Sequence, residues 1–177
     1  MTMGPGLRRF VLTVHVTCAV GWLGAVVAYL ALVLAALTRG DAQTVRAAWI
    51  GMEVIARFVI VPLALASVLI GLVNALGTSW GLFQHYWVLV KLVLTVLATV
   101  VLLLHMPTVT YHADVAAAAD GAAPGGLTGE LLHAGGGLMV LLVTTVLSVY
   151  KPRGLTRYGW RVARAAGGVT TSTTPPA

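Results

Sequence analysis

The stretch FVLTVHVTCAVGWLGAVVAYLALVLAAL, residues 10–37, decides the fold class of this chain. It continues for about 28 residues without an acidic or basic side chain other than one histidine. About 20 apolar residues are enough for a helix to cross a bilayer. The run is longer than the apolar core of a secretory signal peptide, and no small-residue cleavage site follows it. We therefore expect it to form a first transmembrane helix.

The composition of the whole chain is typical of an integral membrane protein. Hydrophobic residues make up 59% of the sequence and charged residues only 9%, whereas a soluble domain carries about 25% charged residues. The net charge of +6 could indicate nucleic-acid binding, but five of the eleven basic residues follow the last apolar run. That clustering is typical of a cytoplasmic flank attracted to anionic lipid headgroups, so we expect no nucleic-acid partner. A single cysteine, Cys18, excludes an intramolecular disulfide.

Three further apolar runs predict three more helices, over residues 45–76, 86–106 and 130–150. Pro62 predicts a kink near Phe58 within the second helix, because proline removes a backbone hydrogen bond. Pro107 and Pro152 are expected to end the third and fourth helices.

The fold class predicted is thus all-α: a polytopic membrane protein with a bundle of four transmembrane helices. We expect the transmembrane domain to cover residues 1–152, with a mobile loop over 114–129. A basic, then disordered, tail is expected over 153–177, because glycine, threonine, serine and proline dominate its end.

The basic residues predict the orientation of the bundle. An even number of spans leaves both termini on one side, which holds Arg8, Arg9 and the basic tail. The opposite side holds only Arg39 and Arg46. Both termini are therefore expected in the cytoplasm, in a multi-pass protein of the bacterial inner (plasma) membrane.

Six ionisable side chains lie inside the predicted spans, where a charge costs about 2.5–3.5 kcal/mol at a helix centre. Counting 1.5 Å of rise per residue separates them by depth. An inner layer holds His15 and Lys91, with Asn74 near the same level; an outer layer holds His105 and His133, with Glu53 near it and Arg57 between the layers.

Each group also has an ordinary structural explanation. Glu53 and Arg57 are spaced i,i+4 and can pair within one helix, which does not exclude a role for Arg57 inside the bundle. His105 and His133 could bond headgroup water, Lys91 could extend to the surface, and His15 could bond a neighbouring helix. Small residues recur beside the histidines and suit either close helix packing or a cofactor: Gly21, Gly24, Ala25, Ser67, Gly71, Ala75 and Gly135 to Gly137.

Two kinds of chemistry suit these residues. A neutral imidazole inside a helical bundle is a common ligand of haem iron, and His15 could serve so, with Lys91, Arg57 or the Arg8–Arg9 pair holding propionates or an anionic substrate. Copper handling is an alternative, because the chain offers soft or borderline ligands: His15, Cys18, Met52, Met106 and Met139. The spacing of these ligands matches no copper motif.

In their order along the chain these residues resemble known membrane families. His15 followed by Trp22 and Gly24 resembles the first helix of CopD-like copper-resistance proteins. A longer series resembles HemJ-type protoporphyrinogen oxidases: Met52, Glu53, Arg57, Pro62, Gly71, Trp87 and Lys91. Over roughly residues 7–150 the chain is most similar to a bacterial membrane family named domain of unknown function 2269.

The HemJ resemblance implies a haem b bound through His15, with Lys91 as an important functional residue. The chain departs from that type at Tyr29-Leu30-Ala31 and at Val54-Ile55, where arginines are expected. Those departures argue against porphyrinogen oxidation but leave a haem scaffold. We therefore predict a haem-b or porphyrin-linked redox protein. The candidate catalytic residues are Lys91 and Arg57. The candidate cofactor-binding residues are His15, His105 and His133, and His15 is also the candidate metal ligand. The alternative is a non-enzymatic transporter, a copper-handling protein or an accessory subunit; as partners we expect a second copy or a membrane complex.

Overall fold

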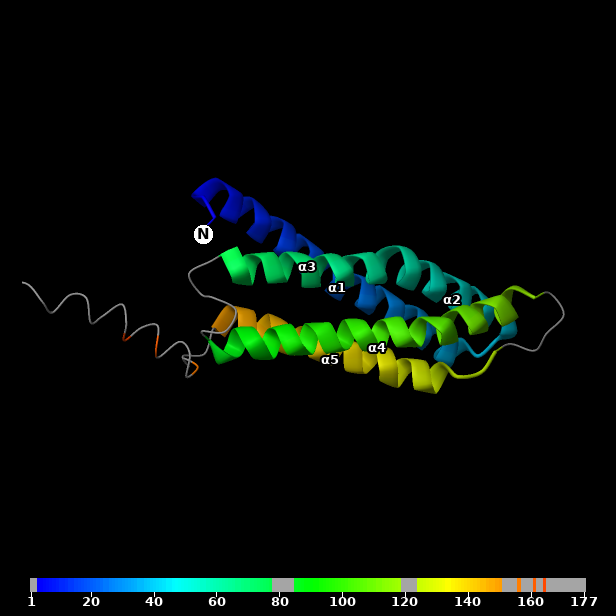
Figure 1. Cartoon of the computed structure of the whole chain (residues 1–177). Helices are drawn as coiled ribbons and strands as arrows, with labels where there is room; N and C mark the ends of the chain where they lie inside the picture. Colours follow the sequence, from blue (N-terminus) through cyan, green and yellow to red (C-terminus); the bar gives the residue numbers. More distant parts are fainter. Residues whose placement is uncertain are drawn as a thin grey trace, which may run out of the picture.

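The computed structural model describes residues 3–77, 85–118 and 124–150, together with 156, 161 and 164. Over these residues the chain is an all-α bundle, shown in Figure 1. Its elements are α1 (Pro5–Arg39), α2 (Ala42–Ile55), the π-helical turn η1 (Ala56–Ile60), α3 (Val61–Gly77), α4 (Tyr86–Ala117) and α5 (Leu127–Tyr150). Since α2, η1 and α3 are continuous, the chain forms four helical columns, each long and apolar enough to cross a membrane. The predicted four-helix membrane bundle is confirmed.

The turn between the first two columns is built from two capping residues. Gly40 ends α1 in the left-handed conformation, with φ 67°, and its N–H donates to the Ala36 carbonyl. Asp41 then caps α2 by accepting the Thr44 N–H at 2.9 Å. That hydrogen bond lowers the pKa of the Asp41 carboxyl below its ordinary value. The tight turn sets α1 and α2 side by side in opposite directions.

The backbone departs from α-helical geometry where the sequence predicts a kink. Pro62 has no N–H to donate to the Phe58 carbonyl four residues earlier. The chain instead adopts the π-helical turn Ala56–Ile60, in which the Val61 N–H bonds the Ala56 carbonyl five residues back. π-Helical turns of this kind are a common way for a helix to absorb a local irregularity.

The predicted end of the third helix at Pro107 is wrong, because α4 continues to Ala117. Val109, Ala113 and Ala116 beyond the proline are all buried. Membrane helices tolerate proline where neighbouring helices pack against the distorted segment. Packing of this extension therefore keeps the helix intact past the missing hydrogen bond.

Other predicted boundaries shift by a few residues. The first helix begins at Pro5 and ends at Arg39, and the last begins at Leu127 rather than at residue 130. The loop predicted over 114–129 is therefore much shorter, and residues 119–123 lie outside the described part of the chain. Most of the tail predicted over 153–177 lies outside it too.

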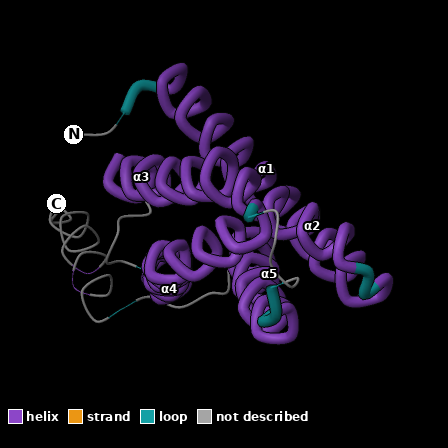
Figure 2. The backbone as a smooth tube through the Cα atoms, turned by 90° about the vertical axis from the view of Figure 1, so that its right-hand side faces the viewer, coloured by secondary structure: helices purple, strands orange, loops and turns teal. Residues whose placement is uncertain are grey.

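The two ends of the bundle differ in packing. The first turns of α1 and the last turns of α5 lie at one end, here named the inner end, and the α1–α2 turn lies at the outer end (Figure 1). Figures 1 and 2 show that α1 runs obliquely across the other helices. The largest of the fully buried side chains, Val33, Trp49 and Met52, belong to the α1–α2 hairpin of the outer half. Phe10, by contrast, is an exposed apolar side chain near the inner end of α1, as suits a lipid-facing surface.

Candidate functional site

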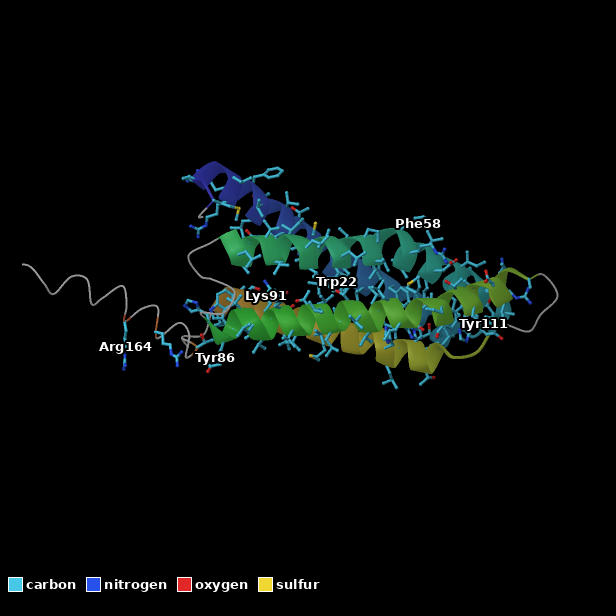
Figure 3. The ribbon with its side chains drawn as sticks, viewed as in Figure 1. Trp22, Phe58, Tyr86, Lys91, Tyr111 and Arg164 are labelled. Carbon is cyan, nitrogen blue, oxygen red and sulfur yellow. The ribbon has the colours of Figure 1, made fainter. Side chains whose placement is uncertain are left out.

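Two cavities lie one above the other inside the bundle. The inner cavity has a volume of about 270 Å³ and the outer cavity about 400 Å³. Trp22 and Leu141 line both cavities, and both side chains are buried. Trp22 lies midway along the bundle in Figure 3. These two side chains therefore form the partition between an inner and an outer site.

The inner cavity brings together the residues predicted to form the inner layer. His15 comes from α1, Asn74 from α3 and Lys91 from α4, and all three line this one cavity. Figure 3 shows Lys91 near the inner end of α4, some turns from Trp22. Counting residues along each helix predicted that these groups lie at one depth. The structure shows that they also line the same cavity.

The His15 ring lies directly against α3. A Cβ atom built on Gly71 would lie 3.0 Å from the His15 Cε1 atom, so only glycine admits the ring at this position without a shift. Ser67 and Ala75, one helical turn before and after Gly71, also line the cavity. Within the described residues, the buried Nδ1 atom of His15 has no hydrogen-bond partner. A buried nitrogen left in this state is costly, and a bound ligand or water is one explanation for it.

The inner cavity has a positive electrostatic character. Arg8 and Lys91 line it, and none of the described residues in its wall carries a carboxylate. Much of the remaining wall is aliphatic, with hydroxyls that bond their own helices; Thr95, for example, donates to the Lys91 carbonyl at 2.7 Å. Cations beside apolar walls suit an amphipathic anion.

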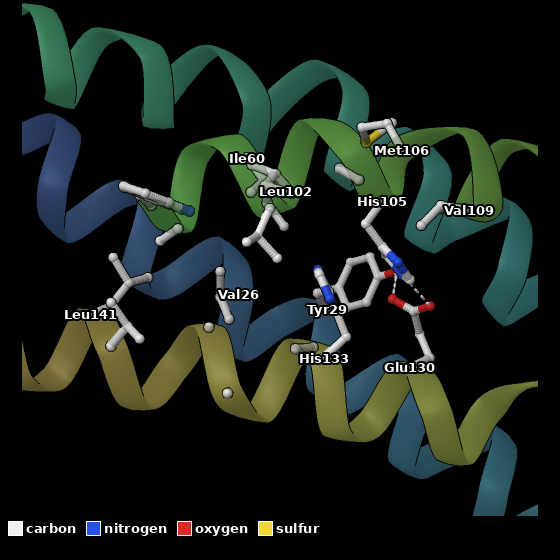
Figure 4. Close-up of a pocket in the computed structure, with 18 of the residues that line it drawn as sticks. Val26, Tyr29, Ile60, Leu102, His105, Met106, Val109, Glu130, His133 and Leu141 are labelled. Carbon is white, nitrogen blue, oxygen red and sulfur yellow. Dashed lines mark hydrogen bonds and ion pairs between the residues drawn. The ribbon is translucent and has the colours of Figure 1, made fainter. Parts of the chain in front are cut away.

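The outer cavity contains a hydrogen-bonded network centred on Glu130. The Tyr29 hydroxyl donates to Glu130 Oε1 at 2.6 Å, and His105 Nε2 lies 2.8 Å from Glu130 Oε2 (Figure 4). Glu130 is only 3% exposed. Because Tyr29, His105 and Glu130 come from α1, α4 and α5, the network joins three helices.

The two histidines predicted to form the outer layer meet in the same cavity. The His105 and His133 rings stack with their centroids 3.7 Å apart and their planes 18° apart. Both line the cavity wall. The stack and the Glu130 network therefore belong to one site, which also has a broad apolar wall.

Glu53 and Arg57 lie elsewhere. Arg57 Nη2 donates to Glu53 Oε1 at 2.7 Å and to Thr110 Oγ1 at 3.0 Å. The Arg57 side chain is 50% exposed, and neither Glu53 nor Arg57 lines either cavity. The ion pair within the helix is thus present, while the catalytic role of Arg57 stays a prediction.

Tyr29 and Glu130 are functional candidates that the sequence analysis missed. Glu130 stands at the predicted start of the last helix, where an acidic residue usually faces water. One signal was available: Glu130 and His133 are three residues apart and so share a helix face. Tyr29 had no such signal, because it lies in a continuous apolar run.

The candidate copper ligands do not converge. Met52 is buried in the core, Met139 is an exposed side chain of α5, and Met106 lines the outer cavity. Over residues 3–77, 85–118 and 124–150 no three His, Cys, Asp or Glu side chains are grouped so as to hold a metal ion.

Comparison with protein families, curated proteins and solved structures finds no match to this chain. The resemblances to the HemJ-type and CopD-like proteins and to domain of unknown function 2269 therefore stay predictions. Evidence on function comes from the two cavities.

Proposed function

We propose that this multi-pass membrane protein binds haem b or a related porphyrin carboxylate in its inner cavity and serves in membrane redox chemistry. One observation carries the proposal: an imidazole and two cations, His15, Arg8 and Lys91, line a single cavity whose described wall contains no carboxylate. We place the protein, by its basic flanks, in a bacterial inner membrane.

The donor set of the inner cavity fits such a group. Histidine is a common axial ligand of haem iron, and helical bundles hold haem between facing helices. Arg8 and Lys91 supply the positive charges that propionates require, and Gly71 leaves the His15 ring room against α3. A volume of about 270 Å³ is just below the range of about 300–1,000 Å³ typical of small-molecule pockets. A porphyrin would therefore extend beyond this cavity.

Each residue has a distinct role in this proposal. His15 would hold the iron, Lys91 and Arg8 would pair with the carboxylates, and Trp22 would separate the group from the outer cavity. A bound haem supplies a one-electron redox couple, while the surrounding protein tunes it through polarity and solvent access. The basic wall would also favour an anionic substrate over a cationic one.

The visible spectrum of the full-length protein, purified in mild detergent from haem-replete cells, tests this function. We expect a Soret band that is lost in His15→Ala and kept in the matched histidine variant His133→Ala. Lys91→Met should weaken haem retention without removing the band. A colourless preparation that does not take up added haem, or a band unchanged in His15→Ala, would refute the proposal.

The stacked cavities favour a second candidate, a non-enzymatic transporter. Each cavity lies toward one end of the bundle, and the partition at Trp22 and Leu141 separates them. Under this alternative, Trp22→Ala should join the cavities and raise solute or proton leakage from liposomes. Unchanged leakage in that variant would argue against it, and copper retained by a colourless preparation would identify the metal as cargo.

A further inference from the structure

The outer cavity has a chemistry that the proposed haem site does not use. Its wall is aliphatic over most of its extent, and its ionisable side chains gather at one end (Figure 4). Those groups are Tyr29, His105, Glu130 and His133. We propose that this cavity binds the head group of a lipid-soluble quinone or quinol, which reaches it from the bilayer between α4 and α5.

The wall of the cavity extends to the lipid-facing surface. Leu97 and Val101 of α4 and Leu132 of α5 line the cavity, and all three are exposed side chains; Leu132 is 73% exposed. A ligand dissolved in the hydrocarbon can therefore reach the cavity along apolar side chains. Access along apolar side chains favours a lipophilic occupant.

The glycine run on α5 keeps this side of the cavity open. Gly136 and Gly137 line the cavity, and a Cβ atom built on either would meet no atom of the described residues within 4 Å. These glycines therefore do not serve close helix packing, which was one of the two explanations that the sequence allowed. Gly135 also has open space around it but does not line the cavity, so it offers a matched control.

The polar end of the cavity selects a neutral head group. Among the described residues that line this cavity there is neither lysine nor arginine, and there is one buried carboxyl group, that of Glu130. A fatty acid or a phospholipid phosphate would place a second negative charge beside Glu130, at an energetic cost in this apolar setting. The carboxyl group of Glu130 thus disfavours an anionic lipid head group in this cavity.

A quinone ring satisfies the remaining requirements. A quinol hydroxyl can donate to the Glu130 carboxylate or to an imidazole nitrogen, and a quinone carbonyl can accept an imidazole N–H. The His105–His133 stack, with centroids 3.7 Å apart, shows that flat rings pack face to face at this end. The volume of about 400 Å³ lies within the range of small-molecule pockets, with the isoprenoid tail continuing into lipid.

Binding of a decyl-tailed ubiquinone analogue to the full-length protein in nanodiscs tests this assignment. Quinones quench tryptophan fluorescence, and Trp22 forms one wall of the cavity, so quenching should saturate and should be reduced in Trp22→Phe. The measurements use the His15→Ala background, in which haem at the inner cavity cannot contribute. The result is therefore independent of the proposed haem function.

Gly137→Leu should fill the cavity and weaken binding at least about tenfold, equal to about 1.4 kcal/mol. The matched Gly135→Leu should change affinity less than about twofold, within ordinary surface effects. Glu130→Gln should weaken quinol binding more than quinone binding, because the quinol donates to the carboxylate. Gly137→Leu leaves the hydrogen-bonded network intact, so it remains informative if Glu130→Gln folds poorly.

Three results would overturn the proposal. The first is quenching that does not saturate in the parent protein. The second is an equal effect of Gly135→Leu and Gly137→Leu. The third is displacement of the quinone by palmitate at the same concentration as by a second quinone, which would make the cavity an unspecific lipid crevice.

Discussion

The hydrogen bond between Tyr29 and Glu130 makes a quantitative prediction about the stability of the bundle. Side-chain hydrogen bonds between membrane helices average about 0.6 kcal/mol in double-mutant cycles, with a maximum near 1.7 kcal/mol. Two features place this one at the upper end. The hydroxyl and the carboxylate oxygen are only 2.6 Å apart, and the residues are 4% and 3% exposed, so no lipid headgroup can replace either partner.

The cycle compares Tyr29→Phe, Glu130→Leu and the double variant. Tyr29→Phe keeps the ring and removes only the donor, while Glu130→Leu replaces the acceptor with an apolar side chain of similar size. We expect a coupling free energy of about 1.5 kcal/mol between the two positions. Because Glu130→Leu also removes the partner of His105, it should cost more than Tyr29→Phe by itself.

Reversible unfolding by sodium dodecyl sulfate in mixed micelles, followed by circular dichroism, measures these free energies. Tyr111→Phe is the control, because Tyr111 is an exposed tyrosine of α4 and should change stability by less than about 0.5 kcal/mol. A coupling free energy below about 0.5 kcal/mol would refute the reasoning. It would mean that Tyr29 and Glu130 find other partners when separated.

Three further predictions concern other parts of the bundle. Gly71→Ala should displace the His15 ring and lower haem retention several-fold. The control Gly24→Ala adds a Cβ atom with no described atom within 4 Å and should leave the Soret band unchanged. Equal effects of the two substitutions would contradict the proposed position of haem beside His15. Arg57→Met should destabilise the protein in the same unfolding assay because Glu53 loses its partner, and adding Glu53→Gln should restore most of the lost unfolding free energy. A double variant as unstable as Arg57→Met would contradict this explanation. The Asp41 carboxylate, whose pKa is lowered on folding, contributes stability above its ordinary pKa of 3.8 that is lost as pH falls through the folded value. Asp41→Asn should therefore flatten the decline of unfolding free energy below pH 4, and an unchanged pH profile would remove this cap from the explanation.

Proline shows how far local sequence rules extend. Pro62 and Pro107 both lie in long apolar runs, and each removes one backbone hydrogen bond. At Pro62 the expected irregularity occurs as a π-helical turn. At Pro107 the helix continues because buried residues such as Val109 and Ala113 pack beyond it. The residues next to Pro107 do not show this packing, so local sequence rules could not predict that the helix continues.

The depth of the polar side chains could be predicted, but their direction around each helix could not. Apolar runs long enough to span the bilayer must be helical, since lipid offers no partner to a backbone N–H or C=O. A constant rise per residue then placed His15 level with Lys91 and His105 level with His133. Rotation about each helix axis depends on packing against the other three helices. Only the tertiary structure therefore turned Arg57 away from both cavities and brought Glu130 to Tyr29 and His105.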